Sequence, residues 1–553
     1  MSLPLLAALV LVTLGLGYHF YGGFVARQYR LERDVETPAR RHNDGLDFVP
    51  TEPFYLLPQH FSAIAAAGPI AGPILACQQF GWLPSILWIG LGVIFIGAVH
   101  DFSTLVASVR HDARSIAEVV KENLGEHAYW AIMVFIWFAL VYVIVAFTDL
   151  TASTFVSGDA EMRGLELPFN PGGAVAMASV LYLTLAVMMG LVARFLAPPL
   201  WLQTLIFVPA TLVAVWAGTW LSTWIVLDAR TWAVLILGYC FVGSLTPVWA
   251  LLQPRGYLGG FVLYLALAFG VVGMFFGGFE VRQEAFRGFV VPGETGQLFP
   301  FLFVTIACGA CSGFHGLICS GTTSKQIARE TDCRPIGYGA MLLEAFVALI
   351  ALGTIMIASG PEIAGKAPGA IYGEGLGRFV SVVLGEEHLL LATTFGAMAF
   401  STFVFDTLDV STRLGRYVMS ELLGWQGRAG AVAATAVMCL VPLLLLLASG
   451  PGSYRVFWTL FGSSNQLLAG LSLLVITVWL RRTGRSSWYT FLPAIFILTI
   501  TLWSLVLQVV AGLGGTGGTI GVVNSAVALA LIALAALLLK SAGRELRVAP
   551  AVR

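Results

Sequence analysis

Polar side chains gather in one apolar segment, residues 299–321, where they could take part in ion binding. Thr305, Ser312 and His315 lie in this segment among several glycines. Oxygen ligands suit hard cations, so the hydroxyl groups would suit a sodium ion held together with backbone carbonyl groups. Small residues would equally allow two helices to pack closely, and the sequence supports both interpretations.

Ionisable side chains inside apolar runs are costly there and are therefore candidates for function. They are His100, Asp101, Asp149, Glu344, Asp406 and Asp409. Asp409 could pair with Arg413 one helical turn further on. Glu344 and Asp149 lack an obvious local partner, and burial favours the protonated form of a carboxyl group. These two are the better candidates for proton coupling, although a hydrogen bond between helices is an alternative role for each.

Cys308, Cys311 and His315 are spaced at i, i+3 and i+7, which places them on one face of a continuous helix. Thiol and imidazole groups could bind a soft metal there. No fourth ligand is evident, and such thiols are more often incidental to a buried face. We therefore expect no metal or cofactor apart from a coupling ion, either Na⁺ or H⁺.

Two Gly-Pro pairs interrupt the segment 60–80. Gly68-Pro69 and Gly72-Pro73 lie near its middle, and each proline removes a backbone donor and clashes with the preceding turn. Non-helical backbone at membrane depth is tolerated where it is buried in protein or lines a cavity. A simple kink is the alternative, but two pairs four residues apart favour a functional break, and the carbonyl group of Ala65 before it is a candidate ion ligand.

A second weak point, Gly243-Ser244-Leu245-Thr246-Pro247, lies in the segment 231–252. This segment is the fifth after 60–80, so the two would cross the membrane in opposite directions. Interrupted helices at matching places of two inverted halves point to a transporter's binding site, where half-helix N-termini face a substrate carboxylate. The predicted substrate-binding residues are Gly68, Pro69, Gly72, Gly243, Ser244 and Thr246.

Composition places most of the chain in a lipid bilayer. Hydrophobic residues make up 58% and charged residues 11% of the 553 residues, and the mean hydropathy is +0.86, whereas soluble proteins have about 25% charged residues. The net charge of zero and the lack of a long basic run give no indication of a nucleic-acid partner. The seven cysteines lie mostly in apolar runs, so no disulfide framework is expected.

About fifteen apolar runs are long enough to span a bilayer as helices. Their approximate limits are 2–25, 60–80, 83–109, 128–157, 172–195, 199–220, 231–252, 256–280, 299–321, 336–358, 387–412, 428–449, 455–480, 488–512 and 520–542. Every second loop is rich in Lys and Arg, as short cytoplasmic loops are. The intervening loops are acidic or mixed, as at Asp159, Glu161 and Glu166, or rich in glycine, as at 513–518. We predict a periplasmic N-terminus and a cytoplasmic C-terminus.

The predicted protein is an all-α integral membrane protein. Spans two to six and seven to eleven would form two inverted five-helix repeats, a transport core at 60–413. Residues 1–59 would hold the first span and a cytoplasmic loop, and residues 414–553 four additional spans. No separate soluble domain is expected, because the longest loop, about 26–59, is only linker-sized.

Several long motifs resemble the carbon starvation protein A (CstA) family. They are RRHNDGLDFVPT at 40–51, FSAIAAAGPIAGPILA at 61–76, TPVWALLQPRGY at 246–257, FPFLFVTIACGACSGFHGLICSGTTSK at 299–325, GYGAMLLEAFVALIAL at 337–352, LDVSTR at 408–413 and LFGSSNQLLAG at 460–470. They follow in order from about residue 40 to about residue 470. Cys311 and Asp149 do not look like family positions, which weakens the case for a metal and for a role of Asp149.

The resemblance implies a bacterial inner-membrane permease that takes up peptides or, in related members, pyruvate during nutrient limitation. It also implies a fold near the amino acid–polyamine–organocation (APC) superfamily, similar to the leucine transporter, in which segment 299–321 packs beside the first broken helix. The ion-coupling candidates are Ala65, Thr305, Ser312, His315, Glu344 and Asp409. His42, Asn43 and Asp44 are candidates for an inner gate or for a cap on the broken helix.

The predicted function is an ion-coupled secondary transporter that imports a small nutrient by alternating access. A membrane-embedded metal-dependent enzyme is one alternative, and it needs a site such as His315 with two cysteines. A nutrient sensor is another, but it would usually carry a signalling domain. The sequence does not decide whether the substrate is a peptide or pyruvate, or whether the coupling ion is a proton or sodium. It also does not decide the oligomeric state.

Overall fold

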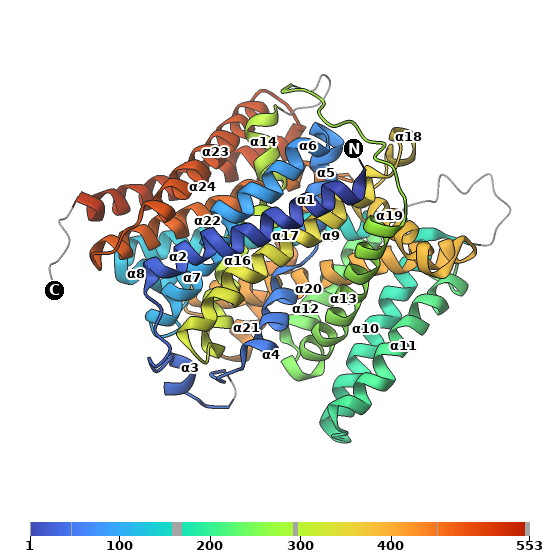
Figure 1. Cartoon of the computed structure of the whole chain (residues 1–553), viewed down its shortest axis with the longest axis horizontal. Coiled ribbons are helices and arrows are strands. Elements are labelled where there is room, and N and C mark those ends of the chain that lie inside the picture. Colours follow the sequence, from blue (N-terminus) through green and yellow to red (C-terminus); the bar gives the residue numbers. More distant parts are fainter. Residues whose placement is uncertain (1, 46, 157–168, 291–296, 451, 548–553) are drawn as a thin grey trace. The chain divides into compact units, whose positions relative to one another are not determined.

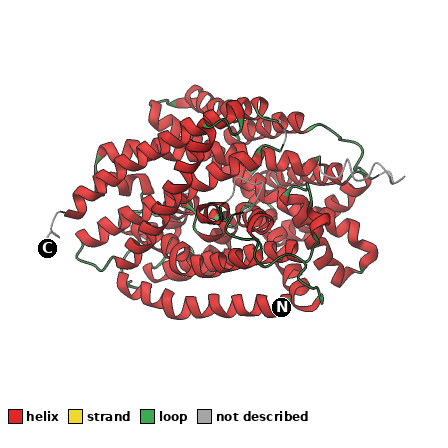
Figure 2. Ribbon diagram, turned by 90° about the horizontal axis from the view of Figure 1, so that it is seen from above, coloured by secondary structure: helices red, strands yellow, loops and turns green. Residues whose placement is uncertain are grey.

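A computed structural model describes residues 2–45, 47–156, 169–290, 297–450 and 452–547. Within these ranges every regular element is a helix, and two isolated β-bridges are the remaining pairings (Figure 2). The predicted all-α class is confirmed. The loop with Asp159, Glu161 and Glu166 lies outside the described residues.

Twelve helical stretches in the described part of the chain are long and apolar enough to cross a membrane, and a bent pair of helices brings the number to thirteen. The twelve are Leu3–Tyr29, Trp82–Arg110, Glu126–Phe155, Pro171–Phe195, Leu200–Trp220, Leu252–Phe276, Glu330–Met356, Glu386–Leu423, Gly427–Ala448, Tyr454–Arg482, Trp488–Leu513 and Gly518–Arg547. The bent pair is α4 (Pro53–Ile64) with α5 (Gly68–Phe80). The chain is therefore a multi-pass membrane protein.

The predicted number of fifteen spans is not confirmed, and two segments account for the difference. Helix α12 (Ala229–Leu245) is apolar but only 17 residues long, short for a bilayer whose hydrocarbon core needs about 20 residues. Segment 299–321 is divided into α14 (Leu298–Thr305), α15 (Ala307–Ala310) and α16 (Gly313–Gly321). Both segments are apolar, but breaks in the helix make the pieces too short to be full-length spans.

The chain forms two compact units, each built from segments far apart in the sequence. Unit 1 comprises Met1–Ala7, Leu140–Glu284 and Ile350–Phe457. Its whole helices are α10 (Pro171–Phe195), α11 (Leu200–Trp220), α12, η4 (Val248–Ala250), α13 (Leu252–Phe276), α18 (Gly360–Ile363), α19 (Pro368–Leu384), η8 (Glu386–His388), α20 (Leu389–Leu423) and α21 (Gly427–Ala448). Neighbours α10 and α11 pack side by side, as do α19 and α20 (Figure 1).

Unit 2 comprises Ala8–Ala139, Ala285–Leu349 and Trp458–Arg553. Its whole helices are η1 (Gly17–Gly22), α2 (Gly23–Tyr29), α3 (Pro38–Arg41), α4, α5, α6 (Trp82–Leu87), η2 (Trp88–Gly97), α7 (Ala98–Arg110), α8 (Ile116–Leu124), α14, α15, α16, η5 (Thr323–Gln326), η6 (Glu330–Asp332), η7 (Arg334–Gly339), α23 (Trp488–Leu513) and α24 (Gly518–Arg547). Helices α1 (Leu3–Leu16), α9 (Glu126–Phe155), α17 (Ala340–Met356) and α22 (Tyr454–Arg482) contribute residues to both units.

Helix α19 occupies a region that the apolar pattern leaves as a loop. Its sequence PGAIYGEGLGRFVSVVL contains Glu374 and Arg378, which lower its hydrophobicity, but glycines recur every four residues. A Cβ atom on Gly373 would lie 2.7 Å from the Cβ atom of Ala397 in α20. The repeated small residues thus let two backbones approach closely, as glycine pairs four residues apart do in membrane helices.

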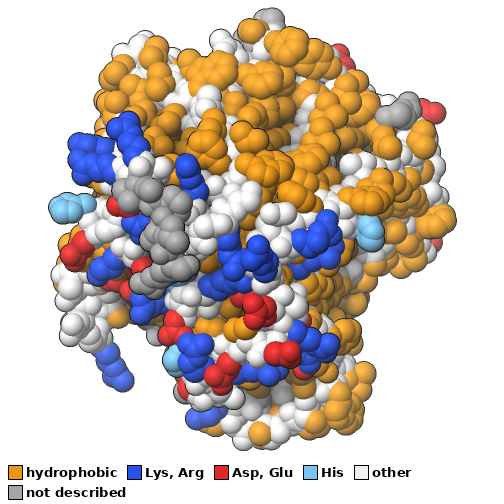
Figure 3. Space-filling model, turned by 60° about the vertical axis from the view of Figure 1, so that its left-hand side comes forward, with side chains coloured by type: hydrophobic (Ala, Val, Ile, Leu, Met, Phe, Trp, Pro, Cys, Tyr) orange, Lys and Arg blue, Asp and Glu red, His pale blue; other side chains and the backbone are white. Residues whose placement is uncertain are grey.

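The surface agrees with a lipid environment. Many large apolar side chains are exposed, such as Phe195 at 75% and Trp220 at 73%. Figure 3 shows hydrophobic side chains over a broad part of one face and charged side chains gathered in another part of it. A soluble monomer rarely exposes large continuous apolar patches, whereas lipid-facing helices do.

Candidate functional site

The segment 60–80 is broken in the structure, as its composition predicts. Helices α4 and α5 are bent by 45° across residues 65–67. Ala65 has a φ of −73° and a ψ of 56°, outside helical geometry. Helix α5 begins at Gly68, and Pro69 occupies its first turn, where a missing amide proton costs no hydrogen bond. Gly72 and Pro73 lie inside α5, so the segment has one break.

The polar segment 299–321 is also broken, which the sequence reasoning did not predict. Cys311 (φ −163°, ψ 108°) and Ser312 (φ −120°, ψ 125°) are extended between α15 and α16. The expectation that Cys308, Cys311 and His315 share one face of a continuous helix is therefore wrong, because the extended residues change the rotation between the two short helices.

The two broken segments cross at close range within unit 2. A Cβ atom on Gly72 of α5 would lie 2.7 Å from the carbonyl oxygen of Thr305 at the end of α14. A Cβ atom on Gly309 of α15 would lie 3.3 Å from the Cα atom of Pro69. Such contacts leave hardly any room for a side chain, so glycine is what allows the two backbones to meet. The segment 299–321 thus packs beside the first broken helix.

An asparagine of α22 holds the second break. Asn465 Oδ1 accepts a hydrogen bond from the Phe314 N–H at 2.9 Å, in the first turn of α16, and Asn465 Nδ2 donates to Ser312 Oγ at 3.0 Å. The amide side chain therefore satisfies polar groups that the break leaves free. Sequence reasoning missed Asn465, although an amide inside an apolar run was a usable signal.

His315, near the start of α16, lies between two buried carboxyl groups. Its Nδ1 atom is 2.9 Å from Asp101 Oδ2, and its Nε2 atom is 3.3 Å from Glu344 Oε2. The other carboxylate oxygen of Asp101 is 2.7 Å from Nδ1 of His100, its neighbour on α7. All four side chains are at most 1% exposed. Two histidines and two carboxyl groups form one network, which we call the His315 network.

The charge of the His315 network depends on its protons. Ionised carboxylates at Asp101 and Glu344 would bring two negative charges into a buried region, which is costly unless a cation lies beside them. A protonated His315 between them supplies that cation. Among the described residues, His100 Nε2 and Glu344 Oε1 have no hydrogen-bond partner. The network thus has buried positions that can accept or release a proton.

Wide helical turns precede both helices that carry the carboxyl groups. The π-helical segment η2 leads into α7, and the π-helical segment η7 leads into α17. A Cβ atom on Gly97, the last residue of η2, would lie 2.1 Å from the carbonyl oxygen of Ala310. The π-turn therefore brings the start of α7 against the break of 299–321, and such turns are frequent at functional sites.

A third buried histidine lies on the first broken segment. His60 Nδ1 is 2.8 Å from Thr323 Oγ1, and His60 Nε2 is 4.0 Å from the Sγ atom of Cys319 on α16. The residue did not stand out in the sequence, because it precedes the apolar core of its segment. It adds a polar contact between α4 and the chain around the end of α16.

Unit 1 contains a separate buried ion-pair cluster. Arg255, which is 1% exposed, lies 2.6 Å from Asp406 Oδ1 through Nη2 and 3.0 Å from Asp409 Oδ2 through Nε. The Tyr239 hydroxyl group donates to Asp409 at 2.6 Å. Arg413, the predicted partner of Asp409, instead donates hydrogen bonds to backbone carbonyl groups at the end of α12. Arg255 was placed in a loop by the sequence reasoning, and Asp409 lies in a different unit from the other ion-coupling candidates.

The predicted break in segment 231–252 is instead the end of a helix. Helix α12 ends at Leu245, and α13 begins at Leu252. Thr246 takes an extended conformation with a ψ of 143°, because the ring of Pro247 disfavours helical geometry in the preceding residue. The proline therefore stops α12 and does not interrupt a longer helix.

The peptide groups at this end are bound by arginines. Arg413 donates to the carbonyl groups of Gly243 and Thr246 at 2.9 and 2.7 Å, and Arg416 donates to that of Ser244 at 2.7 Å. A helix C-terminus has negative partial charge, which cations stabilise. The expected N-terminus facing a substrate carboxylate is thus wrong for these residues. Gly68, Pro69 and Gly72 belong to unit 2, whereas this group belongs to unit 1.

Asp149 has a structural role at a helix end. Its Oδ2 atom accepts a hydrogen bond from the Tyr454 N–H at 2.6 Å, where α22 begins. A carboxylate at a helix N-terminus is stabilised by the free amide groups and by the helix dipole. This contact agrees with the lower priority that the family resemblance gives to Asp149.

The predicted gating residues form a loop of their own. His42 Nε2 lies 2.8 Å from Asp112 Oδ1. Asn43 Oδ1 accepts the Gly45 N–H at 3.2 Å, and Asp44 Oδ1 accepts two further backbone N–H groups. No side chain caps the start of α5, so the expected cap on the broken helix is not formed by this loop.

The cysteines do not gather into a metal site in the described ranges. No group of three or more His, Cys, Asp or Glu side chains there has an arrangement that could hold a metal ion. Both ring nitrogens of His315 face carboxyl groups, and Cys308 Sγ lies 3.2 Å from the Asn465 side chain. The site required by the enzyme alternative, His315 with two cysteines, is therefore not formed.

A broken helix beside a buried, protonatable charge network, within a bundle of apolar spans, is typical of membrane proteins that move ions or solutes. The comparison with known families agrees with this class. The chain belongs to the carbon starvation protein CstA family, which matches residues 2–375 and 355–504.

Relatives match along most of their length. The chain is 34% identical to the peptide transporter CstA of Helicobacter pylori (strain ATCC 700392 / 26695), covering 90% of this chain and 80% of that protein. It is 32% identical to the peptide transporter CstA of Escherichia coli K12, covering 88% and 78%. It is 31% identical to the pyruvate/proton symporter BtsT of Escherichia coli K12, covering 89% and 79%.

Among solved structures, the chain is similar to a mutant of the manganese transporter of Eremococcus coleocola. The TM-score is 0.45 at 12% sequence identity, with 91% of this chain and 99% of that chain covered.

Proposed function

We propose that the chain is a secondary transporter that takes up a peptide or pyruvate together with a proton. Its relatives carry the names of a peptide transporter and of a pyruvate/proton symporter and match about nine-tenths of the chain. These names are those of transporters, which supports transport over catalysis.

The His315 network is the observation that supports proton coupling. His315 lies between Asp101 and Glu344, beside the crossing of the two broken segments. An imidazole held between two carboxyl groups binds or releases one proton with a large change in local electrostatic energy, because the surroundings exclude water. Such a change is what a coupling site needs, provided that the network reaches water on alternate sides.

The substrate carboxylate is proposed to bind at the start of α5. Peptides and pyruvate both carry a carboxylate group. Gly68 begins α5, so its first turn presents backbone amides and a positive partial charge. The glycine at position 72 lets the segment around Thr305 approach, so substrate and proton would share one region of unit 2. The contribution of Gly243, Ser244 and Thr246 stays a prediction from sequence.

Sodium remains a second candidate ion because of the backbone geometry at the two breaks. The carbonyl group of Ala65 lies where α4 ends, and Thr305 ends α14 where the segments cross. Freed carbonyl and hydroxyl oxygens at helix breaks coordinate Na⁺ in other transporters. In this version Ser312 would contribute its hydroxyl group, and the His315 network would have only a structural role.

The wider architecture is also proposed. Fifteen membrane crossings result if α12, the α4–α5 pair and the α14–α16 segment each cross once. The inverted five-plus-five arrangement and the resemblance to the leucine transporter are supported by the position of the first break. The alternation of basic loops supports a bacterial inner-membrane location with the N-terminus in the periplasm.

Uptake into proteoliposomes tests the function. Purified protein would be supplied with labelled dialanine or labelled pyruvate while a pH gradient or a sodium gradient is imposed separately. We expect uptake of at least one substrate above that of empty vesicles, driven by an inside-alkaline pH gradient. The absence of uptake under either gradient and in counterflow would contradict transport, and uptake driven by sodium alone would contradict proton coupling.

A further inference from the structure

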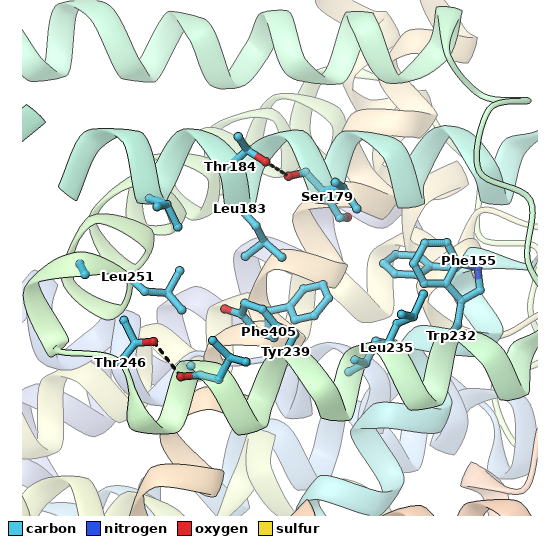
Figure 4. Close-up of a pocket in the computed structure, with 16 residues that line it drawn as sticks. Phe155, Ser179, Leu183, Thr184, Trp232, Leu235, Tyr239, Thr246, Leu251 and Phe405 are labelled. Atoms are coloured by element: carbon cyan, nitrogen blue, oxygen red, sulfur yellow. Dashed lines mark hydrogen bonds between the residues drawn. The ribbon is translucent and has the colours of Figure 1, made fainter. Parts of the chain in front are cut away.

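A groove of about 530 Å³ lies within unit 1, between α10, α12 and α20. Figure 4 shows Leu183 from α10 and Tyr239 from α12 on its opposite walls, with Phe405 beside Tyr239. Phe155 and Trp232 lie toward one end, and Thr246 and Leu251 toward the other. The groove is separate from the His315 network, which belongs to unit 2.

The hydroxyl groups of the groove are already bound to the protein, whereas the indole Nε1 atom of Trp232 is buried without a hydrogen-bond partner. The hydroxyl groups of Thr184 and Thr246 donate to carbonyl groups of their own helices at 2.9 and 2.7 Å (Figure 4). The Ser179 hydroxyl group donates to the Val175 carbonyl group at 2.8 Å, and the Tyr239 hydroxyl group donates to Asp409. Apart from the Trp232 N–H group at one end, the walls therefore offer a ligand apolar surface, which suits a hydrocarbon chain better than a peptide or pyruvate.

The open side of the groove is lined by exposed apolar side chains of the kind that face lipid in a membrane protein. Val180, Val187, Leu235 and Val242 line it and are between 37% and 62% exposed. Along α12 the lining runs from Trp232 to Thr246, and the helical rise of 1.5 Å per residue makes this about 21 Å. That length exceeds the thickness of one leaflet's hydrocarbon, about 15 Å or half of a core of about 30 Å, so the groove is long enough for an acyl chain of one leaflet.

One end of the groove carries positive charge. Arg194 lies over the ring of Trp249 at 5.8 Å, next to the lining residue Ala250. Arg413 reaches the carbonyl group of Thr246 at the same end. Tryptophan and arginine are residues that anchor helices at the head-group level.

Among the described residues, the opposite end carries no comparable net charge. Helix α12 begins there with Asp228 and Arg230, whose charges cancel. Hydrogen bonds from Thr231 hold the pKa of Asp228 below its ordinary value, so it is ionised at neutral pH. The charges thus distinguish the two ends of the groove.

From this arrangement we propose that the groove between α10, α12 and α20 holds an acyl chain of an anionic phospholipid, with its phosphate group at the end marked by Arg194 and Arg413. Hydrocarbon fills the apolar walls between Trp232 and Thr246. The bound lipid fills the space between α10 and α12, so that the two helices contact each other through it.

Native mass spectrometry of the delipidated full chain with added phosphatidylglycerol or phosphatidylcholine tests the proposal. We expect the wild type to bind phosphatidylglycerol more tightly than phosphatidylcholine. Leu183→Trp fills the groove and should weaken binding by about tenfold or more, or roughly 1.4 kcal/mol. Leu191→Trp is the matched control, since Leu191 is on the same helix, 42% exposed and outside the lining; it should bind like the wild type.

A separate variant tests the contact between Arg194 and the lipid head group. Arg194→Gln should reduce the preference for phosphatidylglycerol by about fivefold, as expected for the loss of one basic residue near a lipid surface, worth roughly 1 kcal/mol. Binding of phosphatidylcholine, whose choline cation offsets the charge of its phosphate group, should fall by less. Equal binding of both lipids to the wild type, or equal loss of both in Arg194→Gln, would overturn the anionic assignment.

A measurement on the unaltered chain covers the case in which Leu183→Trp does not fold. Phosphatidylglycerol with a photoreactive group in its acyl chain should label groove residues such as Leu183 or Leu235, identified by peptide mapping. Labelling confined to other helices would overturn the site. Displacement of the label by dialanine or pyruvate would show a substrate site and would equally overturn the lipid assignment.

Discussion

His315 Nδ1 lies 2.9 Å from Asp101 Oδ2, although 214 residues separate the two in the chain. The contact exists because the break at 311–312 starts a new short helix, so that His315 is on its first turn, opposite α7. A helix N-terminus disfavours a cation, and the carboxyl groups of Asp101 and Glu344 offset this penalty. The position of the break and the charge of the histidine therefore depend on each other.

His315→Gln should abolish proton-driven uptake and lower stability. The variant keeps hydrogen-bonding capacity but leaves Asp101 and Glu344 without a cation, and removal of one partner from a buried pair costs about 3–5 kcal/mol. Uptake under a pH gradient and the thermal unfolding midpoint in detergent are the measurements. His127→Gln is the control, because His127 is exposed at the start of α9, and it should retain both.

Glu344→Gln separates coupling from folding. The carboxamide removes one negative charge while His315 still balances Asp101, so the unfolding midpoint should stay closer to the wild type than that of His315→Gln. Proton-driven accumulation should be lost, whereas counterflow of the same substrate should persist. Accumulation at the wild-type level would contradict a role of Glu344 in coupling.

The cluster in unit 1 predicts an order of stabilities. Arg255→Met leaves Asp406 and Asp409 unpaired and should cost about 3–5 kcal/mol. Asp409→Asn should cost less, because it leaves Arg255 with one matched carboxylate. The double variant should be more stable than Arg255→Met alone, since the substitutions are coupled.

Thermal unfolding of the four proteins in one detergent measures the order. Arg230→Met removes an exposed arginine and is the control for the loss of positive charge. If Arg255→Met is as stable as Asp409→Asn, the ion pairs of 2.6 and 3.0 Å do not determine the stability of the cluster.

The sequence was sufficient for the features that depend on local composition. Apolar runs identify most of the helices, and the Gly-Pro pairs locate the break before Gly68, because proline and glycine act on their own turn. The carboxyl groups within spans were recognisable as functional candidates for the same reason, since their cost does not depend on the fold.

Features that depend on distant contacts could not be predicted from the sequence. The break at Cys311 and Ser312 is stabilised by Asn465, which comes from another helix. The burial of Arg255 could not be predicted, because its partners Asp406 and Asp409 come from the distant helix α20. The segment around Gly243 was misread because Thr246-Pro247 has the same local signature at the end of a helix as at a break within one.

Gly72→Ala should impair transport by separating the two broken segments. The added Cβ atom would lie 2.7 Å from the backbone oxygen of Thr305, which cannot rotate away. Overpacking of this kind costs about 1–3 kcal/mol. Uptake and unfolding midpoint should both fall, whereas Gly90→Ala in η2, where no atom lies within 4 Å of an added Cβ atom, should leave both unchanged.

Glu362 should make the region around α18 and α19 sensitive to acid. The Ser359 N–H donates to its carboxylate at 2.6 Å, and Arg378 donates to the other oxygen at 2.6 Å. The Ser359 hydrogen bond is the main reason that the pKa of Glu362 is lowered to about 2 from its ordinary value of 4.5. A lowered pKa in the folded state means that the stabilisation is complete above pH 4.5 and is lost as the pH falls toward 2.

The unfolding midpoints of the wild type and of Glu362→Gln therefore should differ by a constant amount between pH 8 and about pH 5.5. The difference should shrink at more acidic pH, and it should be small, because the side chain is about one-third exposed. A difference that grows on acidification would have the wrong sign for a carboxylate stabilised in its ionised form.

Gly373→Ala tests the close approach of α19 and α20. Alanine favours a helix by about 1 kcal/mol relative to glycine, so without a steric conflict the variant would be at least as stable as the wild type. The added Cβ atom would instead lie 2.7 Å from the Cβ atom and 2.9 Å from the backbone nitrogen of Ala397. We expect a loss of about 1–3 kcal/mol in unfolding free energy from this overpacking. Gly238→Ala in α12, where an added Cβ atom meets nothing within 4 Å, is the control and should be neutral or stabilising. Equal behaviour of the two variants would show that α19 and α20 do not pack this closely.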